Sequence, residues 1–314
     1  MQVFMESLSG VLVILGMILV GYRLTEHGWF KGDADKLIAK LVTQVSLPCY
    51  MLSTITGKFK AHELLEMLPD LRFPVLSMMI LMAIAFALVR IFNIRKGRQG
   101  LFTSMFFNSN TIFVGLPINQ ALFGDRSIPY VLIYYMANTT IFWTLGTFFI
   151  QRDGEKGAKF DLKKTLGKVF SPPLLGFMLG IVLVLLDVRL PTFINRDLAY
   201  LGNLTIPLSM LFIGISVSHA GLAQMSLKKD NLLILLGRFV CAPLLMTVLV
   251  IHAPMPTLMK HVFILQSAMP VMTNAPVVAN LYGADSSYAA VMVTETTLMS
   301  LIVMPILMVI MQSL

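Results

Sequence analysis

A stretch of polar residues that could bind an anion interrupts an otherwise apolar segment, FFNSNTIFVGLP, which ends at Pro117. Proline lacks a backbone N–H and clashes with the preceding helical turn, so a helix is expected to break here, with Gly115 at the break. The half-helix after a break begins with unpaired N–H groups at the positive end of its dipole. Polar side chains at Asn110, Thr111 and the nearby Asn108 would add to them, which predicts a carboxylate site.

A second stretch of the same kind, QSAMPVMTNAPVVAN, contains the two prolines Pro270 and Pro276. Asn110 lies about ten residues into its apolar segment, roughly 15 Å deep, and Thr273 and Asn274 reach a similar depth. Unwound backbone at that depth survives only inside protein or against a wet cavity. The two stretches together therefore predict one substrate site near the membrane midplane. The alternative is a pair of proline kinks whose asparagines satisfy the freed backbone groups.

Glu295 is the one carboxylate deep within an apolar segment. An ionisable group inside a membrane is a functional candidate by default. The hydroxyl oxygens of its neighbours Thr294, Thr296 and Thr297 suit a proton carrier or a hard cation such as Na⁺. We predict an ion-coupling site here. The alternative is a glutamate that is hydrogen-bonded to neighbouring helices for packing.

Arg238, in GRFVCAP, is either an anchor at the membrane surface or a counter-charge for Glu295 or the substrate. The chain has two cysteines, both in apolar segments, which argues against a disulfide framework or a cysteine metal site. The HELLE string at His62 lacks the second histidine of a zinc-protease helix. Motifs of intramembrane enzymes are absent too. We therefore predict no enzyme activity, no metal, and no cofactor other than a coupling ion, H⁺ or Na⁺.

The elements that carry these residues are predicted to lie in a membrane. Hydrophobic residues make up 57% of the 314 residues and charged residues 13%, against about 25% charged in soluble domains. Apolar runs of about 20 residues, enough to cross a ~30 Å hydrocarbon core, recur along the chain. The net charge of +8 comes from basic residues in the short loops between these runs, which favours a lipid bilayer over nucleic acid as the partner.

We predict an all-α integral membrane protein of ten transmembrane helices. Loops after the odd-numbered helices hold most of the Lys and Arg, which places those loops in the cytoplasm and both termini outside the plasma or inner membrane. The predicted spans are residues 3–22, 35–57, 71–92, 99–123, 128–150, 168–187, 194–218, 231–253, 260–282 and 286–312.

An internal repeat divides the chain into halves. VSLPCYML resembles LTIPLSML, and LPINQALFGDRS resembles APVVANLYGADS, so that Pro48 aligns with Pro207 and Pro117 with Pro276, both 159 residues apart. A repeat of five spans must be inverted relative to its partner. Inverted repeats with discontinuous helices are typical of secondary transporters.

The predicted halves are residues 1–150 and 168–314, joined by a cytoplasmic linker at 151–167. A third echo, shifted by two residues, matches the sequence that begins at Asn138 with the one that begins at Glu295. We therefore add the uncharged Asn138 to the ion site, together with Thr296, as an asymmetric pair.

NTIFVGLP followed by ALFGD resembles a motif of the auxin efflux carrier family, which includes plant carriers and bacterial organic-acid permeases. Asn110, Thr111, Gly115 and Pro117 match the motif position by position. The resemblance implies the ten-helix fold of bile-acid symporters and some sodium/proton antiporters, with crossed breaks in helices 4 and 9. It also implies a scaffold of helices 1, 2, 6 and 7 that forms a homodimer. Helices 3–5 and 8–10 would form a moving transport domain, in which Asn110 touches the substrate carboxylate.

The sequence departs from the plant branch of that family in two ways. Its central linker is short, which favours a bacterial-type member, and Glu295 stands where an uncharged residue is expected, which favours ion coupling. We predict a secondary transporter of a small organic anion, a mono- or dicarboxylate such as malate or malonate, or an auxin-like acid, by an elevator or rocking motion. Two alternatives stay open: a cation/proton antiporter with Glu295 as its ion site, and a nontransporting membrane sensor.

Overall fold

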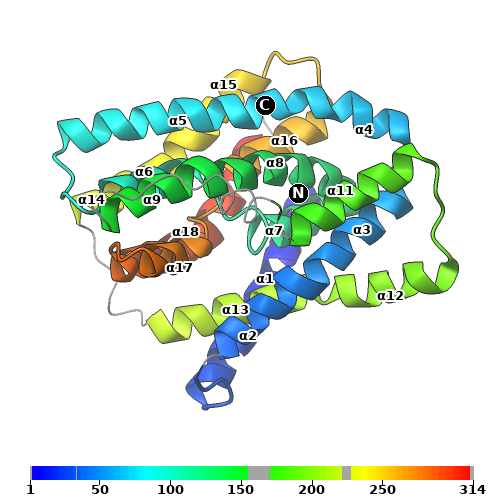
Figure 1. The fold of residues 1–314 in the computed structure, drawn as a ribbon, viewed down its shortest axis with the longest axis horizontal. Helices are drawn as coiled ribbons and strands as arrows, with labels where there is room; N and C mark the ends of the chain where they lie inside the picture. The colour runs from blue at the N-terminus through cyan, green and yellow to red at the C-terminus, as the bar shows by residue number, and fades with distance from the viewer. Residues whose placement is uncertain (1, 33, 155–169, 171, 221–227, 312–314) are drawn as a thin grey trace. The chain divides into compact units, whose positions relative to one another are not determined.

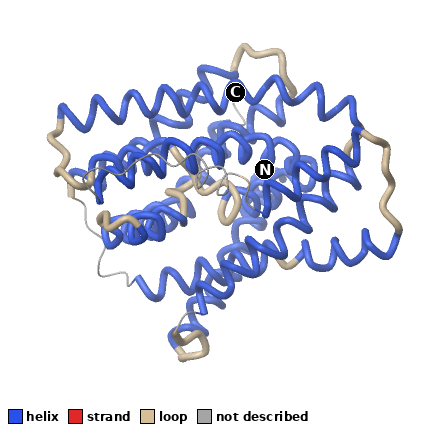
Figure 2. Tube along the Cα trace, viewed as in Figure 1, coloured by secondary structure: helices blue, strands red, loops and turns tan. Residues whose placement is uncertain are grey.

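The computed structural model describes residues 2–32, 34–154, 170, 172–220 and 228–311. Within that part of the chain every regular element is a helix and no strand is present (Figure 2). Six helical stretches in these residues are long and apolar enough to cross a membrane, as expected of an all-helical integral membrane protein. Residues 155–167 of the predicted linker lie outside the described residues, and 151–154 instead complete a helix, α9 (Thr147–Gly154).

The chain divides into two compact units. The smaller unit comprises residues 12–69 and 166–219, and the larger unit comprises residues 1–11, 70–165 and 220–314. Each unit therefore combines segments from both halves of the sequence.

In the smaller unit, α11 and α12 pack against α3. Gly176 lies where α11 meets α3, and a Cβ there would come within 2.6 Å of the carbonyl oxygen of Pro48, so only glycine permits this close approach. The α-helices of this unit, labelled in Figure 1, are α1 (Gln2–Glu26, from residue 12 onward), α2 (Ala34–Leu41), α3 (Leu47–Lys58), α4 (Ala61–Met67), α11 (Pro172–Leu185), α12 (Thr192–Asn203) and α13 (Thr205–Ala220). The π-helical η1 (Val42–Ser46) lies between α2 and α3.

The predicted spans end at residue 57 and resume at residue 71, but residues 61–71 are helical. They form α4 and a 3₁₀ turn, η2 (Leu68–Leu71), which lead directly into α5 (Arg72–Ile91). The backbone N–H of Lys60 donates to the Glu63 carboxylate at 2.9 Å, a local bond that helps to fix the start of α4.

The larger unit has a buried centre formed by α6 and α8. α6 packs against α5 and α9, and α8 packs against α16. Most side chains of α6 and α8 are buried. The remaining elements of this unit are α6 (Gln99–Phe107), α7 (Gly115–Phe123), η3 (Gly124–Ser127), α8 (Ile128–Ile141), η4 (Phe142–Gly146), α14 (Lys229–Leu236), η6 (Gly237–Cys241), α15 (Ala242–Val250), α16 (Thr257–Ser267), α17 (Asn274–Leu281) and α18 (Ser286–Met311).

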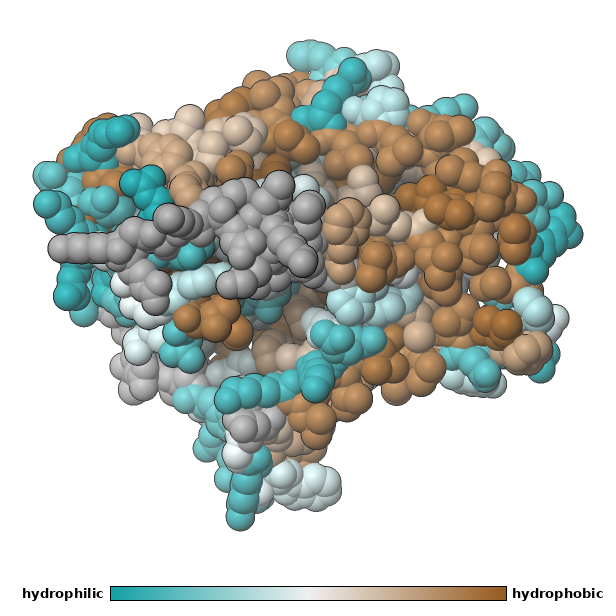
Figure 3. Space-filling model, viewed as in Figure 1, coloured by the Kyte–Doolittle hydropathy of each residue, from teal (hydrophilic) through white to brown (hydrophobic). Residues whose placement is uncertain are grey.

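The outer helices of the larger unit expose apolar side chains. Ile91 on α5 is 68% exposed and Val248 on α15 is 71% exposed. Figure 3 shows hydrophobic residues along much of α5 and hydrophilic residues gathered near the end that leads into α6. Exposed apolar surface of this extent suits contact with lipid, while the buried centre holds the polar residues singled out above.

Candidate functional site

The fourth predicted span is interrupted in the middle of the larger unit. α6 ends at Phe107, Asn108 is extended (φ −94°, ψ 146°), and the helix resumes as α7 at Gly115. The intervening residues are all buried. Pro117 lies in the first turn of α7, where its missing N–H removes no helical bond. Gly115 and Pro117 thus open the second half-helix and do not themselves form the break.

The ninth predicted span is interrupted in the same way. α16 ends at Ser267 and α17 begins at Asn274, with Pro270 in the irregular segment between them. Pro276 lies in the first turn of α17. Thr273 and Asn274 are partly exposed, unlike the fully buried residues of the first break, and no hydrogen bond joins them to Asn110 within the described residues.

The two breaks contact each other directly. The backbone N–H of Asn110 donates to the carbonyl of Pro270 at 2.8 Å, and the Gln266 amide donates to the carbonyl of Thr111 at 3.2 Å. A Cβ on Gly115 would lie 2.3 Å from Gln266 Oε1, so the absence of a side chain lets α16 approach the start of α7. The backbone N–H of Asn110 is thus bonded to the other break.

Side chains from two further helices hold the unwound backbone. Asn138 on α8 donates from Nδ2 to the carbonyl of Ser109 at 2.8 Å and accepts from the Ser109 N–H at 3.0 Å. Thr296 on α18 accepts from the Val271 N–H at 3.0 Å. The sequence assigned Asn138 and Thr296 to ion binding, and the structure shows that their polar atoms bind the backbone of the two breaks.

In the side-chain amide of Asn110, the oxygen has a hydrogen-bond partner and the nitrogen has none among the described residues. Its Oδ1 accepts from the Phe113 N–H at 3.1 Å, which fixes the orientation of the amide. Its Nδ2 is buried and has no hydrogen-bond acceptor among the described residues. The Oδ1 of Asn108 is likewise buried without a donor from these residues. Buried polar atoms without partners are uncommon and mark places where a bound ligand can complete the hydrogen bonding.

Arg238 joins the carbonyl ends of α6 and α16. Its side chain, from the π-helical η6, is only 1% exposed, which excludes the predicted anchor at the membrane surface. The guanidinium donates to the carbonyls of Phe106 (3.1 Å), Ser267 (2.5 Å) and Met269 (2.9 Å). These carbonyls lie at helix ends, where they lack helical partners and carry the negative end of the dipole. π-helical turns are frequent at functional sites.

Glu295 is buried on α18, with 3% of its surface exposed. The side-chain amide of Asn231, in the first turn of α14, donates to Glu295 Oε2 at 2.8 Å. Sequence reasoning missed Asn231 because it directly follows a charged loop, KKD, and reads as the polar start of a helix. The structure places it opposite the one carboxylate buried in an apolar segment.

A charged cluster lies at the end of the larger unit from which α18 starts. Arg98 pairs with Asp285 and, at 3.7 Å, with Asp230, and its guanidinium lies 4.0 Å from the ring centroid of Tyr288. Burial alone would raise the pKa of Asp285, but hydrogen bonds from the Tyr288 N–H and Arg98 outweigh it and lower that pKa. Tyr288 precedes Glu295 by two helical turns, about 10 Å. Along α18, Glu295 therefore lies closer to the end that carries this cluster than to the end at Met311.

The family model and the two relatives described next are all transport proteins. A family model described as "Membrane transport protein" matches residues 6–308. An uncharacterized transporter of Methanocaldococcus jannaschii is 28% identical over 306 residues, which cover 95% of this chain and 97% of the relative. An uncharacterized transporter of Methanothermobacter thermautotrophicus is 26% identical over 310 residues, which cover 97% and 98%. The chain therefore belongs to this family of membrane transport proteins, the auxin efflux carriers, as a multi-pass membrane protein.

Proposed function

We propose that this chain is a secondary active transporter of a small organic anion, a mono- or dicarboxylate, which binds at the two helix breaks. The observation that carries the proposal is Asn110 Nδ2, a buried donor with no acceptor among the described residues. Such a group costs about 1–3 kcal/mol when it is left unpaired. A carboxylate oxygen that enters the break would supply the missing acceptor.

The charges around the breaks favour an anion. The negative ends of α6 and α16 are compensated by Arg238, whose guanidinium donates to their carbonyls. α7 and α17 begin at the breaks, so their positive dipole ends lie in the proposed binding region. A carboxylate could therefore be buried there without a lysine beside it, at a lower cost than in an uncompensated apolar site.

We propose that transport proceeds by movement of the larger unit against the smaller one. The smaller unit contains the predicted spans 2, 6 and 7 and residues 12–22 of span 1, and the larger unit contains spans 3–5 and 8–10. This grouping supports a division into scaffold and transport domain. In each half a polar side chain of a later helix, Asn138 on α8 and Thr296 on α18, binds the unwound backbone of the break, and this similarity supports an inverted repeat. Homodimerisation through the scaffold and the outward position of both termini belong to the same proposal.

We propose that Glu295 binds the coupling ion, H⁺ or Na⁺. The supporting observation is its burial within α18, where the neutral side-chain amide of Asn231 donates to Oε2. The same observation favours a second candidate function, cation/proton antiport, in which Glu295 is the main site and no organic substrate is carried.

The substrate proposal is tested with protein reconstituted in liposomes and a panel of labelled mono- and dicarboxylates. Asn110→Asp keeps an acceptor for the Phe113 N–H and replaces the Nδ2 donor with a second carboxylate oxygen. We expect uptake to fall about ten- to hundredfold, since a hydrogen bond to a charged group is lost and repulsion is added. Asn195→Asp, in the smaller unit, is the matched control and should transport normally. Normal uptake by folded Asn110→Asp protein would refute the assigned role.

The coupling proposal is tested in the same liposomes with imposed H⁺ or Na⁺ gradients. Glu295→Gln keeps the shape of the side chain but cannot carry the charge, so carboxylate uptake should lose its dependence on the gradient. Glu66→Gln, at an exposed position on α4, is the control. Gradient-driven cation flux through wild-type protein without uptake of any carboxylate would instead establish the antiporter.

A further inference from the structure

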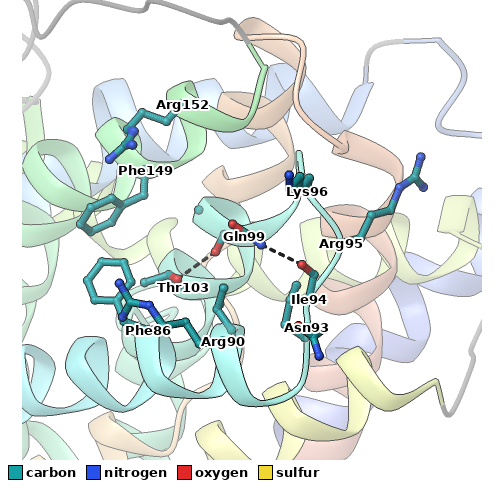
Figure 4. Close-up of a pocket in the computed structure, with 12 residues that line it drawn as sticks. Phe86, Arg90, Asn93, Ile94, Arg95, Lys96, Gln99, Thr103, Phe149 and Arg152 are labelled. Atoms are coloured by element: carbon teal, nitrogen blue, oxygen red, sulfur yellow. Dashed lines mark hydrogen bonds between the residues drawn. The ribbon is translucent and has the colours of Figure 1, made fainter.

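A cavity of about 650 Å³ opens at the end of the larger unit where α5 ends and α6 begins (Figure 4). Its lining comes from α5, the turn that follows it, α6 and α9. The volume lies within the usual range of ligand pockets. None of its lining residues belongs to the two helix breaks, so the cavity is separate from the proposed transport site.

Four cationic side chains line this cavity: Arg90, Arg95, Lys96 and Arg152. The part of the chain that the structure describes offers none of them an ion-pair partner. The carboxylate of Asp153 lies within the electrostatic reach of Arg152 and accepts the backbone N–H of Leu101 at 2.7 Å, at the start of α6. Asp285, which lies within the electrostatic reach of Arg95, is already paired with Arg98. The cavity therefore carries excess positive charge.

Two of the four cations lie beside an apolar floor. The rings of Phe86 and Phe149 meet edge to face, with their centroids 5.2 Å apart. Figure 4 shows Arg90 and Arg152 on the side of these two rings, whereas Arg95 extends away from them. Arg95 and Lys96 lie in the turn between α5 and α6. The Gln99 amide stabilises this turn by donating to the carbonyl of Ile94 at 2.9 Å.

We propose that this cavity binds the phosphate headgroup of an anionic phospholipid. Basic pockets between transmembrane helices on the cytoplasmic side recognise such headgroups, and the Lys- and Arg-rich loops predict that this end is cytoplasmic. The apolar surface continues outward from the cavity, since Ile91 follows Arg90 on α5 and is 68% exposed. A lipid can place its phosphate among the cations while its acyl chains follow α5. A soluble phosphate could use only the charged rim.

The experiment measures binding of phosphatidylglycerol and phosphatidylcholine to the purified protein in detergent by native mass spectrometry. Wild-type protein should prefer phosphatidylglycerol. The double variant Arg90→Gln/Arg152→Gln should lose about 25-fold in phosphatidylglycerol affinity, because each cation near a membrane surface contributes roughly one factor of five. Both positions are exposed, so the fold should tolerate the change. Arg72→Gln, at the opposite end of α5, is the matched control and should bind as wild type does.

Three outcomes would overturn the proposal. One is equal binding of the two lipids by wild-type protein. Another is an equal loss of phosphatidylglycerol binding in Arg72→Gln and in the double variant. The third is displacement of phosphatidylglycerol by glycerol phosphate at a comparable concentration, which would make this a site for soluble phosphates. Because the readout is lipid binding, the result is independent of whether the chain transports a carboxylate.

Discussion

Asn110 and Asn138 both bond the unwound backbone between α6 and α7, but they use their side-chain amides differently. Asn138 uses both ends of its amide on Ser109, so it replaces the helical bonds that the break removes. Asn110 uses only Oδ1, on the Phe113 N–H, and its Nδ2 faces no acceptor among the described residues. Backbone at membrane depth must be satisfied by protein. Asn138, whose amide is fully used on the backbone, therefore has a structural role. Asn110 retains a donor without an acceptor, which suits it to bind a ligand.

This difference predicts that Asn138→Ala acts through stability. The change would leave the buried N–H of Ser109 without a partner, at about 1–3 kcal/mol, and would remove one of the two hydrogen bonds that the Ser109 carbonyl accepts, the other coming from the Thr111 N–H. We expect a lower midpoint of thermal unfolding in detergent and weaker transport, with no change in substrate preference. Thr139→Val is the control, because the Thr139 hydroxyl is buried with no hydrogen bond to the described residues. A stable Asn138→Ala protein with altered substrate preference would contradict this role.

Single residues were predictable from sequence only where their own segment gave the signal. Asn110 and Thr111 stand in a segment whose apolar context makes polar residues conspicuous, and both lie at the contact between the breaks. Asn231 and Gln266 could not be assigned in this way, because their roles depend on partners 64 and 155 residues away. Such pairings appear only once the helices are packed.

Among the elements, the interrupted helices were the most predictable. Proline is tolerated in the first turn of a helix but not in its interior, so Pro117 and Pro276 indicate new helix starts inside apolar segments, and both interruptions could be expected without knowledge of the neighbouring helices. The π-helical turns η1, η4 and η6 leave no such mark, because they continue a helix with one altered hydrogen-bond step. Of the three π-helical turns that the sequence did not predict, η6 matters most for the site, because it carries the buried Arg238.

We predict that Arg238 stabilises the packing of α6 against α16, since its guanidinium binds a carbonyl of each helix. Arg238→Lys retains the charge, but a single ammonium cannot match the planar fork that binds carbonyls of both helices. We expect Arg238→Lys to unfold at a lower temperature than wild type, since each orphaned carbonyl costs about 1–3 kcal/mol. Arg72→Lys is the control, because the Arg72 side chain is 62% exposed. Equal unfolding temperatures for the two variants would show that the bonds of Arg238 to the helix ends contribute little.

Across the whole molecule, residues distant in sequence are gathered into each compact unit. The smaller unit joins residues 12–69 to 166–219, and the larger unit joins 70–165 to 220–314. Sequence periodicity gives the helices but not this grouping, which comes from contacts between the two halves of the chain. Two units with separate internal packing are the arrangement that alternating access by movement of one domain against another requires.

The motion is predicted to change distances between the units and to leave distances within each unit unchanged. Pairs of spin labels are placed on a variant in which Cys49 and Cys241 are replaced by serine. Exposed positions provide a pair within the larger unit, a pair within the smaller unit, and a pair between them: Ile91 with Val248, Trp29 with Tyr200, and Val248 with Tyr200.

Double electron–electron resonance is then recorded in liposomes with and without a transported carboxylate and an ion gradient. The Val248–Tyr200 distances should shift between two populations as substrate is added, because the larger unit would move as one body. The two pairs within units should keep their distributions, since both residues of each pair belong to the same compact unit. A constant Val248–Tyr200 distribution in protein that is actively transporting would refute movement of the larger unit. Broadening within the larger unit would point to a local change at the helix breaks instead.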